Sequence, residues 1–193
     1  MEKRNQLIQC FLRKNQQINL SAIRDEQGVF IKHIQDSLEI TKFFNFPSGS
    51  KIADLWTGSG FPLLPLAKEF PECHFTGIDS VRKKTIAIND IIKEMSIQNA
   101  EVLRTRIEEI KDKKFDFLTA RAVAYSDKLI PRAYPLLKKG GKMIFRKQKS
   151  EEEWKMIEKM IKKYHLKMNI IHEYTLFEGD IERIIYIIEK KIT

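Results

Sequence analysis

The chain has 193 residues, which suits a single domain with a core of two or three layers. Lysine and arginine outnumber aspartate and glutamate by 35 to 26, and the net charge of +9 favours a polyanionic partner such as nucleic acid, with a merely solvated basic surface as the alternative. Cys10 and Cys73 lack metal-ligand spacing, and neither a signal peptide nor an apolar run of membrane-spanning length is evident, so we expect a cytoplasmic monomer with neither a metal site nor a membrane span.

Residues 1–46 are expected to form helices that pack onto the rest of the chain. Apolar residues recur with helical spacing in two groups: Leu7, Phe11 and Leu12, and then Phe30, Ile34 and Leu38. Asp25 is a candidate N-cap for the second helix. Residues 47–193 form the expected α/β core, and because no flexible linker divides the chain we expect residues 1–193 to be one domain.

From residue 51 onward, apolar strands alternate with amphipathic helices. The strands are expected at residues 52–55, 75–78, 100–103, 115–119 and 143–145. Gly140 and Gly141 are expected to form the turn before the last of these, and the clearest helices follow Asp79 and begin at Glu151. Such alternation is typical of a mainly parallel sheet.

The C-terminal end differs from this pattern. Two strand-like runs, 168–176 and 181–188, are joined only by residues 177–180. Because so short a connection cannot cross over a sheet, it predicts an antiparallel hairpin.

The stretch 51–79 narrows the function most, because it reads as a strand, a glycine-containing turn, a helix and a strand that ends on a carboxylate. Gly58 and Gly60 allow the main chain to approach a ligand closely, and Asp79 stands where a carboxylate accepts ribose hydroxyls. The third glycine of the dinucleotide pattern is missing after Gly60, which weakens that interpretation. A nicotinamide-dependent oxidoreductase therefore remains only an alternative.

The acid at the end of the second strand and the terminal hairpin resemble the S-adenosylmethionine-dependent methyltransferase fold, a Rossmann-like, mostly parallel seven-stranded sheet. Further motifs follow in order along the chain: NLSAIRD at 19–25, HIQDSL at 33–38, DLWTGSGFP at 54–62, Asp79-Ser80 with Lys83-Lys84, RIEE at 106–109 and ARAVA at 120–124. Together they resemble the RsmG family, also called glucose-inhibited division protein B. That family methylates N7 of a guanine in small-subunit (16S) ribosomal RNA.

The resemblance implies a cofactor site for S-adenosylmethionine and a substrate of small-subunit ribosomal RNA, free or within a ribosomal particle. The residues that match the cofactor site are Trp56, Gly58, Gly60, Phe61, Asp79, Ile107, Glu108 and Arg121. Asp79 matches the ribose end, and the pair at 107 and 108 matches the adenine side. The candidate RNA-contacting residues are Arg24, Lys83, Arg121 and Lys147. Arg121 is expected either to neutralise the methionine carboxylate or to hold the guanine or a phosphate, and an ion pair within the protein is the structural alternative.

Two departures from the family motif stand out, because Trp56 and Leu63 occupy positions where the family has glycine. A positive φ at Trp56 would strain the backbone, and a large ring there can occupy ligand space. A catalytically weakened RNA-binding relative is therefore a second alternative.

The substrate atom sets the expected mechanism. Guanine N7 offers a lone pair and carries no proton, so its methylation needs no general base, and we nominate no catalytic acid or base. Alignment of the reacting atoms and exclusion of water should supply the rate. His33, Asp36 and Ser37 form a further polar group that either faces the cleft or joins helices.

Overall fold

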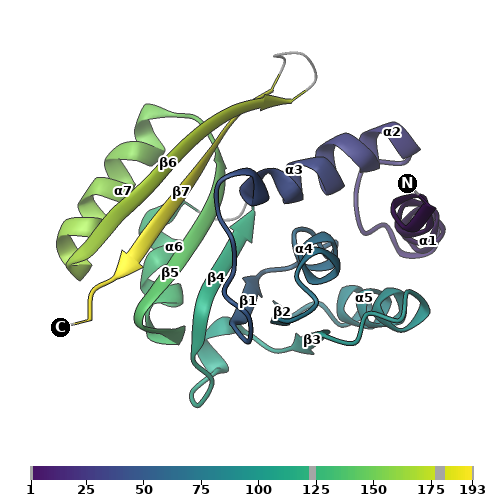
Figure 1. Cartoon of the computed structure of the whole chain (residues 1–193), viewed down its shortest axis with the longest axis horizontal. Coiled ribbons are helices and arrows are strands. Elements are labelled where there is room, and N and C mark those ends of the chain that lie inside the picture. The colour runs from purple at the N-terminus through teal and green to yellow at the C-terminus, as the bar shows by residue number, and fades with distance from the viewer. Residues whose placement is uncertain (1, 122–124, 177–180, 193) are drawn as a thin grey trace.

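A computed structural model describes residues 2–121, 125–176 and 181–192, which form one seven-stranded sheet covered by helices on both faces (Figure 1). The strands are β1 (Lys51–Leu55), β2 (His74–Asp79), β3 (Ala100–Arg104), β4 (Phe115–Arg121), β5 (Leu137–Gln148), β6 (Leu166–Leu176) and β7 (Ile181–Lys190). Their order in the sheet is β3-β2-β1-β4-β5-β7-β6. Strands β1 to β5 pair in parallel, and β7 is antiparallel to both β5 and β6.

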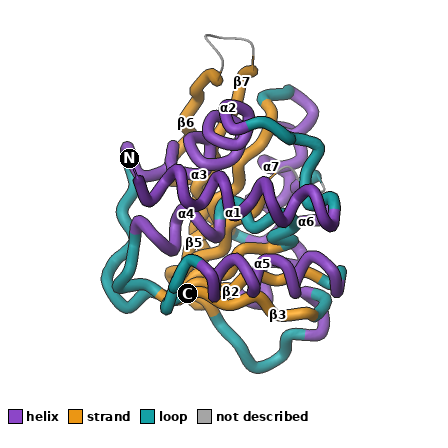
Figure 2. Tube along the Cα trace, turned by 90° about the vertical axis from the view of Figure 1, so that its right-hand side faces the viewer, coloured by secondary structure: helices purple, strands orange, loops and turns teal. Residues whose placement is uncertain are grey.

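The sheet separates the core into two clusters, one on each face. The α-helices are α1 (Glu2–Ile18), α2 (Glu26–Val29), α3 (Asp36–Leu38), α4 (Leu63–Glu69), α5 (Arg82–Glu94), α6 (Ser126–Ala133) and α7 (Glu151–Tyr164). Residues of α4 and α5 pack on one face of the sheet, with α1 against α5 on the same side (Figure 2), and residues of α6 and α7 pack on the other face. Neighbouring residues of a strand serve opposite clusters, as Ile144 and Phe145 do, so the central strands read as continuous apolar runs.

This architecture confirms the expected mostly parallel sheet and the antiparallel hairpin. The connection 177–180 lies outside the described residues. Each of the five parallel strands overlaps its expected position, since the hydrophobic runs were strong.

Strand β5 starts earlier than expected, which corrects the turn assigned to Gly140 and Gly141. Both glycines lie within β5, which begins at Leu137. The pairing of β4 with β5 shifts register between Phe115 and Phe117, and Gly140 has a φ of 74°. A glycine at an irregularity of this kind is typical of a β-bulge, so the strand passes through the glycines instead of starting after them.

The N-terminal segment is helical as expected, but its second helix changes type along its length. It continues from α2 through a π-helical stretch, Phe30–Gln35, into α3 and then into a 3₁₀ turn, Glu39–Lys42. Asp25 is its N-cap, because its carboxylate accepts a hydrogen bond from the Gly28 amide at 2.7 Å. Apolar residues of this segment share a core cluster with the sheet. Among the described residues, no helix has the length and apolar character needed to span a membrane.

Candidate functional site

The glycine-containing loop lies where β1 ends, at the carboxyl edge of the parallel strands. Gly58 and Gly60 both have positive φ, 55° and 85°. A Cβ at Gly60 would lie 2.9 Å from a Leu64 side-chain carbon, so this glycine is needed for packing inside the protein. At Gly58 the nearest atom to such a Cβ is the Trp56 carbonyl oxygen, at 3.5 Å. The open side of the loop is therefore at Gly58, where a ligand can approach the main chain.

Asp79 links the end of β2 to this loop. Its Oδ2 accepts a hydrogen bond from the Gly58 amide at 3.0 Å, and its Oδ1 accepts one from the Val81 amide at 2.8 Å. Because a carboxylate oxygen can accept more than one hydrogen bond, Asp79 shapes the loop and keeps capacity for a ligand.

Two cavities meet at Trp56. The smaller, of about 440 Å³, is lined by Trp56, Asp79, Ile107 and Glu108 among others, so four residues expected from the sequence come together there. The larger, of about 950 Å³, contains Trp56, Gly58, Phe61, Arg121 and Lys147 in its wall. A ligand that extends along the loop past Trp56 would touch both cavities.

Trp56 has a φ of 53°, which is the positive value that disfavours a side chain with a Cβ. Its ring is partly buried against the core cluster on the α6 side, and the Arg132 guanidinium carbon lies 5.9 Å from the ring centroid. Arg132 Nε in turn lies 2.8 Å from Glu108 Oε1. The tryptophan thus belongs to the wall between the cavities. Arg132 was not expected from the sequence, because no pattern indicated α6.

Leu63, the second departure from the family motif, is fully buried in the core. A Cβ built on Gly77 would lie 2.9 Å from a Leu63 methyl carbon, so Leu63 fills the space above that glycine. Leu63 does not line either of the two cavities. It therefore leaves the space beside the glycine loop open.

A buried polar pair underlies the loop and was missed in the sequence. Asp54 Oδ1 accepts a hydrogen bond from the Thr119 hydroxyl at 2.9 Å, whereas Asp54 Oδ2 and Thr57 Oγ1 are buried and make no hydrogen bond of standard geometry with the described residues. Burial raises the pKa of Asp54 to about 6, although the nearby Thr57 hydroxyl, like that of Thr119, acts to lower this pKa. Unpaired buried polar atoms are costly, and they lie directly below the loop.

Arg121 is held by the N-terminal segment. Its Nη1 donates to the Lys32 carbonyl oxygen at 2.7 Å and lies 3.4 Å from Asp36 Oδ2. Burial acts to raise the pKa of Asp36, but the guanidinium groups of Arg146 and Arg121 outweigh it and hold that pKa below its usual value. The ion pair within the protein therefore exists, and the same arginine lines the larger cavity.

The four candidate RNA-contacting residues lie in different environments. Arg24 and Lys83 are exposed, and Arg24 donates to Asn19 Oδ1 at 2.6 Å. Lys147 is buried, with Nζ at 3.1 Å from Glu153 Oε1. Lys147 also lines the larger cavity, so its contact with RNA stays a prediction that has to be reconciled with the ion pair to Glu153. Its position on a central strand buries it, which the surrounding run of basic residues did not reveal.

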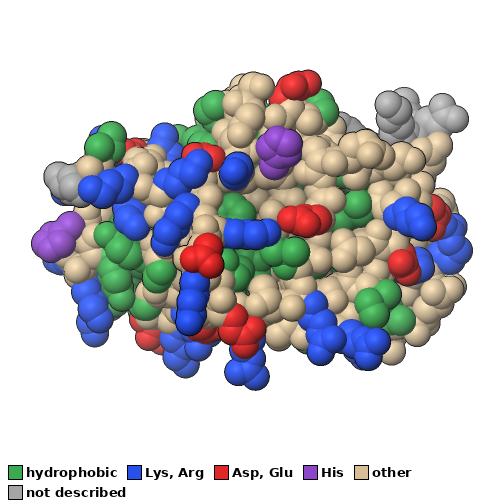
Figure 3. Space-filling model, turned by 90° about the horizontal axis from the view of Figure 1, so that it is seen from below, with side chains coloured by type: hydrophobic (Ala, Val, Ile, Leu, Met, Phe, Trp, Pro, Cys, Tyr) green, Lys and Arg blue, Asp and Glu red, His purple; other side chains and the backbone are tan. Residues whose placement is uncertain are grey.

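Positive charge nevertheless predominates in the larger cavity. Its basic residues are Lys32, Lys84, Arg121, Arg146, Lys147, Lys149 and Arg183, and its acidic residues are Asp36, Glu152 and Glu153. Basic side chains also lie on the face of the molecule seen in Figure 3, where they are mixed with acidic ones. The overall charge is therefore not confined to the cavity, and the residues of its wall carry more information than the net charge.

Solved structures resemble this chain in fold. A ribosomal protein L11 methylase from Lactobacillus delbrueckii subsp. bulgaricus superposes with a TM-score of 0.66 and 20% identity over 83% of this chain and 79% of that one. A SAM-dependent methyltransferase from Aquifex aeolicus gives a TM-score of 0.62 and 18% identity, over 79% and 89%. The fold is that of S-adenosylmethionine-dependent methyltransferases.

Sequence relatives define the family more closely. A protein named Ribosomal RNA small subunit methyltransferase G from Pelodictyon phaeoclathratiforme is 43% identical over 135 residues, which cover 70% of this chain and 59% of that protein. A Staphylococcus aureus protein of the same name is 34% identical over 182 residues, covering 92% and 76%. Residues 1–179 match the family model described as GidB, rRNA small subunit methyltransferase G. The chain therefore belongs to the GidB family of rRNA small subunit methyltransferase G proteins.

Proposed function

We propose that this protein transfers a methyl group from S-adenosylmethionine to N7 of a guanine in small-subunit (16S) ribosomal RNA. The observation that carries the proposal is the meeting of two cavities at the glycine loop, one suited to a nucleoside and one larger and predominantly basic. Membership of the family supports the same reaction, and it does not favour a nicotinamide-dependent oxidoreductase.

The residues present fit the cofactor. Asp79 has acceptor capacity for the ribose hydroxyls, and Ile107 and Glu108 line the same cavity on the side assigned to adenine. The methionine portion would lie along Gly58 towards the larger cavity, above the unpaired oxygens of Asp54 and Thr57. When bound, S-adenosylmethionine supplies the electrophilic methyl group.

The chain's own residues act by position. Guanine N7 has no proton to remove, so no side chain has to act as a base. The buried Phe61 ring and the half-buried Trp56 ring limit water beside the loop, and Arg121 presents a fixed positive charge to an anionic group of either ligand. Among the candidate RNA contacts, Arg24 and Lys83 are outside the walls of both cavities, so they would serve the flanking backbone of the RNA.

Two experiments test the proposal. Calorimetry with S-adenosylmethionine, S-adenosylhomocysteine and NAD should show binding of the first two alone. Incubation with S-adenosylmethionine and small-subunit RNA or ribosomal particles from cells lacking the protein should add one methyl group to a guanine, detected by mass mapping. Cofactor binding without methylation of RNA or particles would refute the reaction, and absence of cofactor binding at millimolar concentration would favour the weakened RNA-binding relative.

We expect the protein to act in the cytoplasm as a monomer in which residues 1–193 form a single domain. Light scattering during gel filtration should give the mass of a single chain. A mass twice as large would contradict this part of the proposal.

A further inference from the structure

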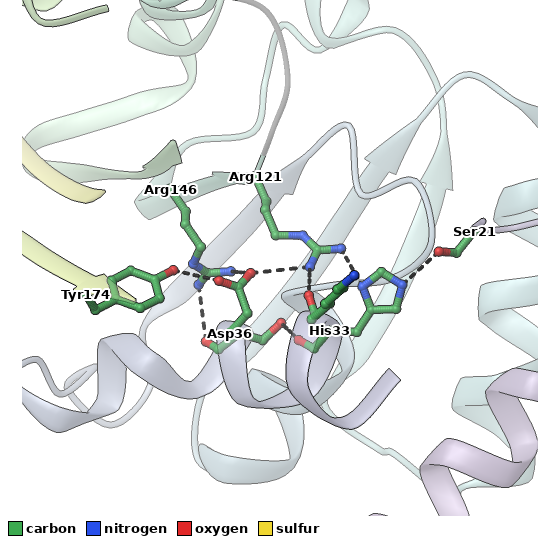
Figure 4. Close-up of polar contacts among 8 residues, drawn as sticks. Ser21, His33, Asp36, Arg121, Arg146 and Tyr174 are labelled. Atoms are coloured by element: carbon green, nitrogen blue, oxygen red, sulfur yellow. Dashed lines mark hydrogen bonds and ion pairs between the residues drawn. The ribbon is translucent and has the colours of Figure 1, made fainter. Parts of the chain in front are cut away.

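A buried polar network joins the N-terminal segment to the carboxyl ends of β4 and β5 (Figure 4). Asp36 Oδ2 lies 3.4 Å from Arg121 Nη1 and 3.3 Å from Arg146 Nη1. Asp36 Oδ1 accepts a hydrogen bond from the Tyr174 hydroxyl at 2.6 Å. Arg121 continues the network to His33, which has no role in the mechanism described above.

The protonation of His33 follows from its two partners. Its Nδ1 lies 3.0 Å from Arg121 Nη2, and its Nε2 lies 2.9 Å from Ser21 Oγ. Because a guanidinium group only donates, Nδ1 must be the acceptor, and a neutral imidazole then carries its hydrogen on Nε2 and donates it to Ser21. Burial, reinforced by the charge of Arg121, lowers the pKa of His33 to about 3. The ring is therefore a neutral acceptor at physiological pH.

The same ring also contacts the cofactor loop. The His33 and Phe61 rings are stacked, with centroids 4.6 Å apart and planes 12° apart. Phe61 follows Gly60 directly, and the Arg121 guanidinium carbon lies 5.9 Å from the Phe61 centroid. His33, Phe61 and Arg121 all line the larger cavity.

The groups that hold Arg121 come from a π-helical stretch and from the residue that follows it. His33 and Lys32 lie within the stretch Phe30–Gln35, where the wider turn changes which carbonyl groups bond inside the helix. The Lys32 carbonyl accepts a hydrogen bond from Arg121. Arg121 is thus held from one side by three groups of a single helical run: a carbonyl oxygen, the Asp36 carboxylate and the His33 nitrogen.

We propose that His33 is a positioning residue for methyl transfer, which fixes the Arg121 guanidinium through Nδ1 and the Phe61 ring by stacking. The proposal rests on the proposed methyltransferase reaction. It follows that the N-terminal segment sets the orientation of the Arg121 guanidinium, because all three acceptors described come from residues 32, 33 and 36 of that segment.

Two substitutions separate the acceptor from the ring. His33→Phe keeps an aromatic ring against Phe61 and removes the acceptor, whereas His33→Asn keeps an acceptor oxygen near the position of Nδ1 and removes the ring. With S-adenosylmethionine saturating, we expect kcat to fall at least tenfold in His33→Phe and less than threefold in His33→Asn. The melting temperature should fall more in His33→Asn, because that variant loses more packing. A larger loss of kcat in His33→Asn, or equal losses in both, would overturn the proposal.

His172→Phe is a matched control. His172 also joins β6 to the N-terminal segment, with Nε2 at 3.1 Å from Glu39 Oε1, but it is not part of the cavity wall. Its substitution should change kcat by less than twofold. A loss equal to that of His33→Phe would mean that any loosening of the segment lowers activity, and the specific role of His33 would be wrong.

Two further measurements keep the test independent of one variant. In a double-mutant cycle, His33→Phe should add little to the loss caused by Arg121→Gln, whereas additive losses would contradict action through Arg121. In ¹⁵N spectra, hydrogen exchange at Arg121 Nη2, the atom that contacts His33, should be slow in the wild type and in His33→Asn and at least tenfold faster in His33→Phe. Unchanged exchange in His33→Phe would overturn the role proposed for His33. Failure of the wild type to methylate RNA would refute the proposed function, and the exchange experiment would still test the contact between His33 and Arg121.

Discussion

Trp56 combines a backbone conformation that favours glycine with a side chain in the wall between both cavities. Replacement by glycine should relieve about 1 kcal/mol of backbone strain, which offsets part of the packing lost with the ring. Trp56→Ala loses the same ring contacts but keeps the strain. We therefore expect Trp56→Gly to be about 1 kcal/mol more stable than Trp56→Ala in urea unfolding, the reverse of the usual order for these two residues.

Binding to the same variants tests the space beside the loop. Calorimetry with S-adenosylmethionine should give equal or tighter binding to Trp56→Gly than to the wild type. If binding is lost in Trp56→Gly while the fold is intact, the ring is a required part of the cofactor site and the reading of Trp56 as an obstacle is wrong.

Asp54 makes a prediction about pH. Burial raises its folded-state pKa to about 6 from the ordinary value of 3.8, so between these pH values the folded chain binds a proton that the unfolded chain releases. This carboxyl group therefore lowers stability as pH rises from 3.8 to 6. Asp54→Asn removes the ionisation and keeps an acceptor for Thr119.

The variant should gain up to about 3 kcal/mol over the wild type at pH 7, and the gain should vanish near pH 4. Urea unfolding at the two pH values measures the difference. An equal gain in stability at both pH values would show that ionisation of Asp54 does not destabilise the fold. Thr119→Val, which removes the hydrogen bond to Asp54 without changing charge, is the control.

At the scale of elements, the helical run 26–42 carries the groups that hold Arg121, so the stability of its first turn matters for the site. Asp25 caps this run through the Gly28 amide. Asp25→Ala should lower the free energy of unfolding by about 1 kcal/mol, and Asp25→Ser should recover most of it. Urea unfolding provides the measurement. Equal stability of both variants and the wild type would mean that packing alone holds the run.

The elements differ in how far the sequence predicts them. The Asp25 cap, the parallel strands and the terminal hairpin follow from local patterns, so they were predicted. Helix α6 spans eight residues and contains Pro131, so its helical periodicity is too short to recognise. The π-helical stretch Phe30–Gln35 was not expected, because the helical spacing of its apolar residues does not distinguish π-helical from α-helical backbone.

The same distinction applies to the site. Gly58, which opens the main chain to a ligand, and Asp79, which offers its carboxylate, lie in a motif of fixed spacing, so the sequence predicts that they lie at one site. Arg132 and His33 reach the site from separate elements, and their roles arise from partners that are distant in the chain. Burial likewise distinguishes Lys147 from exposed lysines that look equivalent in the sequence.

For the molecule as a whole, the net charge of +9 predicts salt-sensitive RNA binding, but only contacts made in the complex contribute to the slope. Lys84 and Arg183 line the larger cavity. Lys167 is exposed near the start of β6 and pairs with Glu189, which in turn pairs with Lys142, so it lies towards the end of β5 that is away from the cavity. Each of Lys84→Gln and Arg183→Gln should reduce the slope of log K against log salt by about 0.7 for single-stranded RNA.

Lys167→Gln should leave that slope unchanged, although it removes the same charge. Fluorescence anisotropy with a labelled small-subunit RNA fragment from 50 to about 300 mM salt gives the slopes. If all three variants shift the slope equally, binding follows overall charge and the cavity does not define the RNA interface. A shift confined to Lys84 and Arg183 would locate the phosphate contacts around the cavity that contains Arg121, where the proposed reaction would bring the guanine to the methyl donor.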